Sequence, residues 1–277
     1  MSATFGERLR VTVFGQSHSE AMGAVVDGLP AGLRIDTEHL RAFLARRAPG
    51  QGPLTTARRE PDAPEIIAGL ADGVTCGAPL CILIRNTDAR SRDYETLRRV
   101  VRPSHADYPA YVRFGGHNDI RGGGQFSGRL TAPLCAAGAV ALQCLAARGV
   151  GVYAHIASIA GIKDAAVDPV SPDLPALAAL AAKPLPVLDA RAGEAMAQAV
   201  RDAAADGDSV GGVVESPACP PASASRSTTA SRAGWPRCCS PSPPSRAWNS
   251  ARASPPPRCA AAKTTMATRP PAAKSAR

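Results

Sequence analysis

The amino-acid sequence predicts an α/β fold over residues 1–215, because strand-like and helix-like segments follow one another along that part of the chain. Residues 8–14 alternate as a half-buried strand does, and residues 22–29 form a second apolar strand. Residues 130–148 form the longest apolar stretch, with a proline near its start. We interpret it as a buried helix, since a membrane span needs about 20 largely apolar residues.

Shorter patterns predict the remaining elements of this α/β fold. Thr37 is the predicted N-cap of a helix that extends to about Ala45. Residues 85–129 are rich in glycine and charge and show little periodicity, which is typical of a segment that forms a site. Further strands are predicted at residues 65–70, 79–84 and 150–160, helical segments interrupted by proline at 173–205, and a turn followed by a strand at 206–215.

Charge and composition change abruptly near residue 216. Residues 1–215 hold 22 Lys+Arg and 23 Asp+Glu, whereas residues 216–277 hold 10 Lys+Arg and no acidic residue. The second segment also carries 12 of the 26 prolines and has no lasting periodicity, so we expect a basic Pro/Ser/Ala-rich tail that is disordered. Binding of nucleic acid through this tail is an alternative function. It is disfavoured because aromatic residues for base stacking are scarce there.

Cysteine spacing and the first residues exclude two other classes. The eight cysteines include no Cys-x-x-Cys pair and no His/Cys ligand spacing, so no metal site is predicted. The segment from Met1 to Arg10 is already charged, which disfavours a secretory signal. We therefore expect a cytoplasmic protein with free thiols, and neither a nucleic-acid nor a membrane partner.

Two histidines are candidate acid–base groups. His18 follows a predicted strand and a glycine turn, and an imidazole titrates near neutral pH. His105 lies two residues before Asp107, which is close enough in sequence to orient it. The alternative for His18 is a loop histidine that is bound only by backbone groups.

Glycine and arginine motifs indicate an anionic ligand. Three glycines at 122–124 precede the predicted buried helix, and glycines at a helix start let backbone N–H groups approach an anion. Arg121 and Arg129 flank them and could clamp a phosphate, although a flexible loop is the alternative. Arginines at 46–47 and 58–59 either decorate a solvated face or bind a phosphorylated acid. Together the motifs predict acid–base chemistry on a phosphorylated substrate.

These motifs belong to a longer series of blocks in the first 215 residues. The blocks are GQSHSE at 15–20, VDGLPAGL at 26–33, RRAPGQ at 46–51, TTARREPD at 55–62, IRNTDARSRDY at 84–94, RPSHADY at 102–108, DIRGGGQFSGR at 119–129 and DGDSVGGVVE at 206–215. In order and in spacing, this series resembles the chorismate synthase family. Gln16 and Ser19 stand where the commoner family motif has glutamate and glycine.

The resemblance implies a reaction, cofactors and site residues. The family eliminates phosphate from 5-enolpyruvylshikimate 3-phosphate to give chorismate and requires reduced FMN, with NADPH as a candidate reductant. His18 would protonate the leaving phosphate and His105 the reduced flavin. Arg47 matches a position that contacts NADP in some members. Gln125, Phe126 and Ser127 match a flavin-binding stretch, and the candidates for substrate and flavin phosphates are Arg46, Arg102, Arg121 and Arg129.

The resemblance also implies a fold and a domain division. The family fold is a sandwich of helices between antiparallel sheets, assembled as a homotetramer; we expect it over residues 1–215, truncated in its second half, and the assembly of this chain stays open. Trp248–Asn249–Ser250, read one base earlier, allows family-like codons, so we hypothesise that residues 216–277 are out of frame. We then expect the chain as written to be inactive. The alternative is a non-catalytic remnant that binds flavin or phosphate.

Overall fold

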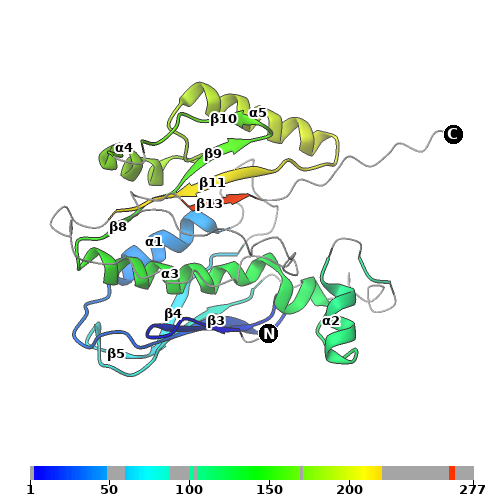
Figure 1. Cartoon of the computed structure of the whole chain (residues 1–277). Helices are drawn as coiled ribbons and strands as arrows, with labels where there is room; N and C mark the ends of the chain where they lie inside the picture. Colours follow the sequence, from blue (N-terminus) through cyan, green and yellow to red (C-terminus); the bar gives the residue numbers. More distant parts are fainter. Residues whose placement is uncertain are drawn as a thin grey trace, which may run out of the picture. The chain divides into compact units, whose positions relative to one another are not determined.

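The computed structural model describes most of the first 219 residues and divides them into two compact units. Each unit has its own antiparallel sheet with helices on one face (Figure 1). The described residues are 3–48, 60–87, 100–102, 105–168, 171–219 and 262–265, of which 3–147 belong to the first unit and the rest to the second.

A five-stranded antiparallel sheet is the base of the first unit. The strands predicted at 8–14, 22–29, 65–70 and 79–84 are confirmed as β2, β3, β4 and β7. A two-stranded ribbon of β5 (Leu70–Ala71) and β6 (Val74–Thr75) accompanies the sheet. In sheet order the strands are β1 (Thr4–Phe5), β2 (Arg10–Gly15), β3 (Ala21–Asp27), β7 (Leu80–Arg85) and β4 (Pro64–Ala68).

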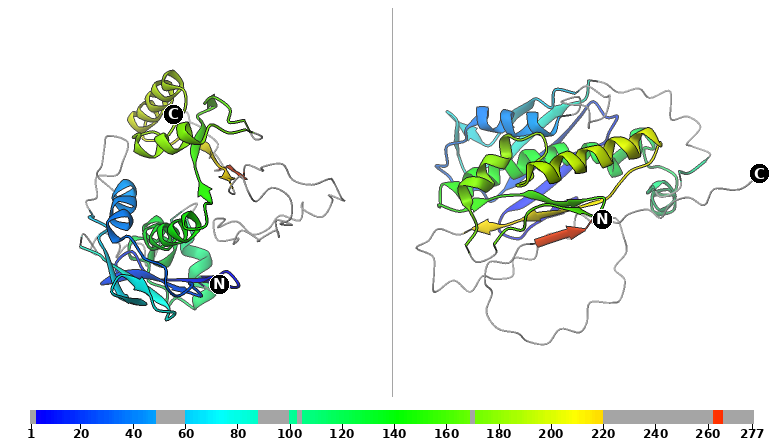
Figure 2. Two further views of the ribbon diagram at one scale, coloured as in Figure 1. Left: turned by 90° about the vertical axis from the view of Figure 1, so that its left-hand side faces the viewer. Right: turned by 90° about the horizontal axis from the view of Figure 1, so that it is seen from above.

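Alternation along the two central strands forms the core. Side chains of successive residues in a strand point to opposite faces, so every second residue faces the helices. On β7 these are Leu80, Ile82 and Ile84, which are fully buried, and on β3 they include Met22 and Val26. The apolar core therefore lies between this sheet and the helices α1 and α3, as the end-on view in Figure 2 shows.

Helix α1 spans Thr37–Arg47, and its N-cap lies one residue before the predicted one. The N-cap is Asp36, whose carboxylate accepts a 2.9 Å hydrogen bond from the backbone N–H of His39, so the prediction of Thr37 is wrong by one residue. Leu40 and Leu44 lie one turn apart and are buried. The helix ends at Arg47, and its C-cap Ala48 leaves the helical conformation because a proline follows it.

Helix α3 (Thr131–Ala146) confirms the predicted buried helix. Its small residues Ala132, Ala136 and Ala139 are fully buried and let the helix approach β3 and β7 closely. The continuous stretch Gly128–Ala146 is long and apolar enough to cross a membrane by length and composition alone. Its buried face belongs to the core of this unit, which is the arrangement of a core helix.

Part of the segment 85–129, which shows little periodicity in the sequence, is regular. It contains α2 (Asp107–Phe114), η3 (Arg121–Phe126) and the start of η4 (Gly128–Leu130). Only Asp107 and Ala110 of α2 are buried, so the helix has no apolar stripe from which it could have been predicted.

The second unit is a four-stranded antiparallel sheet in the order β10-β9-β11-β13, with α5 packed against β9 and β10. The strands are β9 (His155–Ile159), β10 (Ile162–Lys163), β11 (Gly212–Ser216) and β13 (Ala262–Thr265). A two-stranded piece pairs β8 (Gly151–Val152) with β12 (Ala218–Cys219). The helices are α4 (Leu174–Ala179), η5 (Leu180–Ala182) and α5 (Ala190–Ala205).

Most predictions for this unit hold, with two differences. The strand predicted at 150–160 is broken into β8 and β9, while the helices predicted at 173–205 and the strand at the end of 206–215 are confirmed. Of the predicted tail, residues 216–219 and 262–265 are described, and β13 pairs with β11. The disorder and the frame shift predicted for the tail otherwise concern residues outside the described ones and stay predictions.

Candidate functional site

His18 lies in a tight turn between β2 and β3. Gly15 opens the turn with a φ of +98°, where a Cβ would meet the backbone of Met22 at 2.5 Å. The Ser19 hydroxyl accepts a 2.9 Å bond from the Gln16 N–H and lies 2.6 Å from the carbonyl of Ala21, to which it can donate. The side chain of His18 is almost completely buried. The turn is therefore held by its own hydrogen bonds.

The glycines 122–124 pack directly against this turn. All three have positive φ, and the carbonyl of Gly124 accepts a 3.1 Å hydrogen bond from the backbone N–H of Ser17. A Cβ built on Gly122 would lie 2.6 Å from Cδ2 and 2.7 Å from Nε2 of His18. There is no room for a side chain at that point, so glycine is required both by its conformation and by its neighbour.

His105 contacts the next glycine of the same loop. A Cβ on Gly123 would lie 3.0 Å from Nε2 and 3.1 Å from Cε1 of His105. The two histidines that the sequence singles out are thus brought to adjacent positions of one glycine loop. That loop, 122–124, is called the glycine loop below.

A carboxylate contacts the Nδ1 side of His105, and a guanidinium binds that carboxylate. Asp107, at the first position of α2, lies with Oδ1 2.6 Å from Nδ1 of His105. Arg102 donates to Asp107 from Nε at 2.8 Å and from Nη2 at 2.9 Å. These hydrogen bonds hold the pKa of Asp107 well below its usual value.

Arg121 forms a similar pair beside His18. Its Nε and Nη2 donate to the two oxygens of Asp119 at 2.9 Å and 2.8 Å. The hydrogen bonds from Arg121 lower the pKa of Asp119, and the charge of nearby His18 contributes in the same direction. Arg121 is therefore an ion-paired cation at the edge of the glycine loop.

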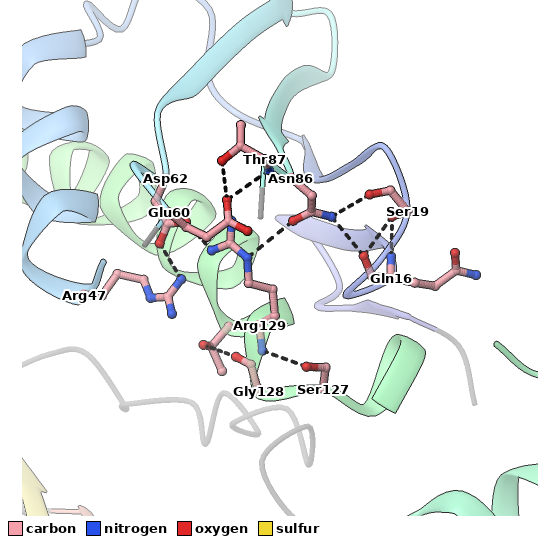
Figure 3. A network of polar contacts seen from close by, with 11 residues as sticks. Gln16, Ser19, Arg47, Glu60, Asp62, Asn86, Thr87, Ser127, Gly128 and Arg129 are labelled. Atoms are coloured by element: carbon pink, nitrogen blue, oxygen red, sulfur yellow. Dashed lines mark hydrogen bonds and ion pairs between the residues drawn. The ribbon is translucent and has the colours of Figure 1, made fainter. Parts of the chain in front are cut away.

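Arg129 and Arg47 meet in a second network, which Figure 3 shows from close by. The Arg129 guanidinium is buried and pairs with Asp62 through Nη1, while its Nη2 lies 3.4 Å from Oε2 of Glu60. Arg47 donates from Nη1 to the other oxygen of Asp62 at 2.7 Å. Two guanidiniums and two carboxylates balance one another in this interior position.

Asn86 connects this network to the turn that carries His18. Its Nδ2 donates to the carbonyl of Ser19 at 2.8 Å and lies 3.2 Å from that of Gln16, and its Oδ1 accepts from Nε of Arg129 at 3.4 Å (Figure 3). The oxygen Oε2 of Glu60 accepts from both the backbone N–H and the hydroxyl of Thr87. Hydrogen bonds of Asn86 therefore connect the Arg129 network with the turn that carries His18.

The other predicted site residues lie at the margins. Arg46 is exposed and lies over the ring of Phe43, 5.6 Å from its centroid. Gln125 and Phe126 are exposed at the end of η3, where the ring of Phe126 lies 6.5 Å from that of Phe114. Ser127 caps η4 by accepting from the backbone N–H of Arg129 at 3.3 Å.

Sequence reasoning assigned ligands to the arginines and overlooked their carboxylate partners. Glu60, Asp62, Asn86 and Asp119 all lie inside the quoted blocks, so their presence there was the available signal. Within the described residues, no group of three or more His, Cys, Asp or Glu side chains is arranged to hold a metal ion.

Comparisons with known proteins match this geometry to one family. The sequence profile described as chorismate synthase matches residues 9–221. A chorismate synthase from Aeropyrum pernix is 47% identical over 212 residues, which are 76% of this chain and 55% of that relative. One from Methanocella arvoryzae is 42% identical over 214 residues, which are 76% of this chain and 56% of that relative.

A solved crystal structure of a chorismate synthase has the same fold. Its TM-score is 0.59 at 24% sequence identity, and the match covers 76% of this chain and 58% of the other. The expected mixture of helices and antiparallel sheets is therefore confirmed. The chain spans about half the length of the curated relatives it matches.

Proposed function

Because the chain belongs to the chorismate synthase family, we propose that it carries the acid–base groups of a phosphate-eliminating lyase. The substrate is 5-enolpyruvylshikimate 3-phosphate, and loss of its phosphate and a proton gives chorismate. One observation carries the proposal: His18 and His105 meet adjacent residues of one glycine loop. Two imidazoles at one loop can each transfer one proton during a single elimination.

Each histidine has a separate task in this proposal. His18 donates a proton to the departing phosphate, which leaves more easily as a less charged ion. His105 lies beside Gly123 and would protonate the reduced flavin. Asp107 lies 2.6 Å from Nδ1 of His105 and is itself held by Arg102, which supports an acid–base role for His105.

The residues of the loop suit the reduced FMN that the family implies. The two candidate histidines lie against the loop, Arg102 lies near Gly123, Arg121 belongs to the same short helix, and Phe126 adds an exposed aromatic ring. Reduced FMN supplies electron density that assists departure of the phosphate without net oxidation. Gln125, Phe126 and Ser127 are the residues proposed to hold it, and Arg47 is proposed to contact NADPH as its reductant.

Phosphate binding is proposed for Arg46, Arg102, Arg121 and Arg129. Arg102 and Arg121 are best placed for it, since Arg102 lies beside His105 and Arg121 pairs with Asp119, whose carboxylate interacts with His18. Arg129 is buried between Glu60 and Asp62, so we propose that it acts mainly by shaping the site. Arg46 extends from the exposed surface of α1. We propose a cytoplasmic location for the enzyme and the homotetramer for the full-length family.

Anaerobic turnover of the substrate with reduced FMN tests the proposal. Two proteins are compared: the 277-residue chain, and a fusion in which residues 216–277 are replaced by the corresponding C-terminal part of the Aeropyrum pernix relative. We expect chorismate from the fusion and none from the chain alone, because residues 216–277 contain no block that resembles the family. Flavin binding by the chain without turnover would favour the non-catalytic alternative for it.

His18→Ala and His105→Ala in the active fusion are each expected to lower kcat by about 10²–10⁴-fold, the usual contribution of a general acid or base. His39→Ala is the matched control, because His39 lies at the start of α1 and contacts the ring of Phe43 instead of the glycine loop. Unchanged turnover in either site variant removes that histidine from the mechanism.

A further inference from the structure

Asp107 occupies an unusual position between a permanent cation and a candidate proton carrier. Its side chain is 6% exposed, and it accepts hydrogen bonds from three donors of Arg102. The backbone N–H and Nε of Arg102 donate to Oδ2 at 3.1 Å and 2.8 Å, and Nη2 donates to Oδ1 at 2.9 Å. Oδ1 is also the oxygen that lies 2.6 Å from Nδ1 of His105.

This arrangement leaves Asp107 only one protonation state near neutral pH. A guanidinium has no acceptor and does not lose its proton in proteins, and a backbone N–H can only donate. The three Arg102 groups are therefore fixed donors. The start of α2 also favours a negative charge at its first position. An ionised carboxylate can only accept hydrogen bonds, so the ring nitrogen that faces it must donate.

The geometry thereby decides which ring nitrogen of His105 carries the proton. Arg102 Nη2 lies almost equally far from both ring nitrogens, 3.2 Å from Nδ1 and 3.4 Å from Nε2, and cannot select between them. The 2.6 Å contact with Asp107 involves Nδ1 alone. Neutral His105 therefore has its proton on Nδ1 and a lone pair on Nε2.

Nε2 is also the nitrogen that faces the glycine loop. The position of a Cβ on Gly123 lies 3.0 Å from Nε2, so this atom points to the same backbone that His18 contacts at Gly122. We propose that Asp107 is a positioning residue, which locks His105 in the Nδ1–H tautomer so that Nε2 alone accepts and returns a proton over the glycine loop. The assignment of the tautomer is independent of the proposed function, and only the catalytic use of the proton at Nε2 rests on it.

The proton balance of this step is simple. In the neutral ring Nε2 accepts a proton and His105 becomes an imidazolium that donates to Asp107 through Nδ1 throughout. When Nε2 returns the proton, the Nδ1–H bond is unchanged. Asp107 never needs to be protonated, because Arg102 stabilises its charge in both states.

Nuclear magnetic resonance of the ¹⁵N-labelled 277-residue protein tests the assignment without substrate or flavin. The ring nitrogens of His105 are identified by their loss in His105→Gln, and their ¹⁵N shifts show which one is protonated in the neutral ring. We expect a protonated Nδ1 and an unprotonated Nε2. A wild-type His105 that is protonated on Nε2 when neutral overturns the proposal, whatever any variant does.

Asp107→Asn is expected to invert the tautomer. The amide oxygen will take the place of Oδ2, where two Arg102 donors meet it, because the opposite orientation sets two donors against the amide nitrogen instead of one. The amide N–H then faces Nδ1, which must accept, and the proton moves to Nε2. Persistence of the Nδ1–H form in Asp107→Asn contradicts the proposal.

Two companions separate positioning from general damage to the fold. Asp119→Asn removes the other ion-paired carboxylate of the site, which contacts Arg121 and not His105, and should leave the tautomer of His105 unchanged. Asp107→Glu keeps an ionised acceptor and should retain the Nδ1–H form. Inversion of the tautomer in either variant shows that a charge at position 107 does not control it. Absence of chorismate formation by the fusion protein would refute the proposed function and leave this result for His105 untouched.

Discussion

Gly122→Ala is the most direct test of whether the glycine loop holds His18 in place. Gly122 has a φ of +59° and a ψ of 16°, so alanine there occupies the left-handed region, at a cost of about 1–2 kcal/mol. The added Cβ lies 2.6 Å from Cδ2 of His18 and 2.6 Å from Oγ of Ser17. Neither side chain can remain where it is.

The expected loss of stability combines strain and steric overlap. Overpacking against buried side chains such as Ser17 and His18 typically costs about 1–3 kcal/mol. Strain and overlap together therefore give about 2–4 kcal/mol if the turn relaxes in part. For a domain of 150–250 residues, each kcal/mol shifts Tm by roughly 2–4 °C, which predicts a decrease of about 4–16 °C. The ring signals of His18 should shift as well, because its imidazole must move.

Gly128→Ala is the matched control. Gly128 lies in the same segment, its φ is outside the left-handed region, and no atom of the described residues beyond its chain neighbours lies within 4 Å of the place that an added Cβ would take. It should change the free energy of unfolding by less than about 1 kcal/mol. Both variants are compared by thermal and urea unfolding of the 277-residue protein. Equal stability of the two, with the His18 signals of Gly122→Ala in place, would refute the argument that the loop has no room for a side chain.

Two other outcomes concern the ion pairs. In Asp62→Asn the backbone keeps its φ of +48°, because asparagine tolerates this conformation. The substitution removes the charge of a fully buried side chain, so Arg129 stays buried with one carboxylate fewer. We expect the free energy of unfolding to fall by about 3–5 kcal/mol. Glu38→Gln, on an exposed pair, should cost under about 1 kcal/mol in the same urea titration. Because hydrogen bonds from Arg102 lower the pKa of Asp107 in the folded state, its contribution to stability is complete above the unfolded pKa near 3.9 and is lost as pH falls toward the folded value. As the pH is lowered from 6 to about 2, the urea midpoint of unfolding should therefore decrease less steeply in Asp107→Asn than in the wild type. Parallel plots of midpoint against pH for the two proteins would contradict this.

Elements with a strong local pattern could be predicted from the sequence. The strands β2, β3 and β7 and the helix α3 follow from alternation and from a long apolar run, which depend on neighbouring residues alone. Helix α2 could not be predicted in this way, because its large apolar residues Tyr108, Tyr111 and Val112 are exposed. Periodicity reports burial, so a helix that buries only an aspartate and an alanine leaves no trace in it.

The candidate site shows a similar division. That His18 and His105 suit acid–base chemistry could be predicted from their motifs. The approach of His18 to the glycine loop depends on contacts between segments about a hundred residues apart in the sequence. The motif around residues 119–129 predicts glycines whose backbone an anion could approach. In the structure His18 packs against Gly122 and His105 against Gly123. No spacing rule contains that information, because it depends on how β2, α2 and η3 pack.

Charge was the property that sequence reasoning overestimated most. The sequence suggests a cluster of free cations for a phosphate, yet four of the five predicted arginines each pair with a carboxylate: Arg47, Arg102, Arg121 and Arg129. Such pairing lowers the long-range attraction for an anion, because a neutral pair has a weak field at a distance. It also fixes side chains whose free rotamers would otherwise cost about 1.5–2 kcal/mol each to order when a ligand binds. A phosphate that reaches Arg102 or Arg121 therefore meets donors already oriented by Asp107 and Asp119, and selection in this site depends on short-range geometry more than on net charge.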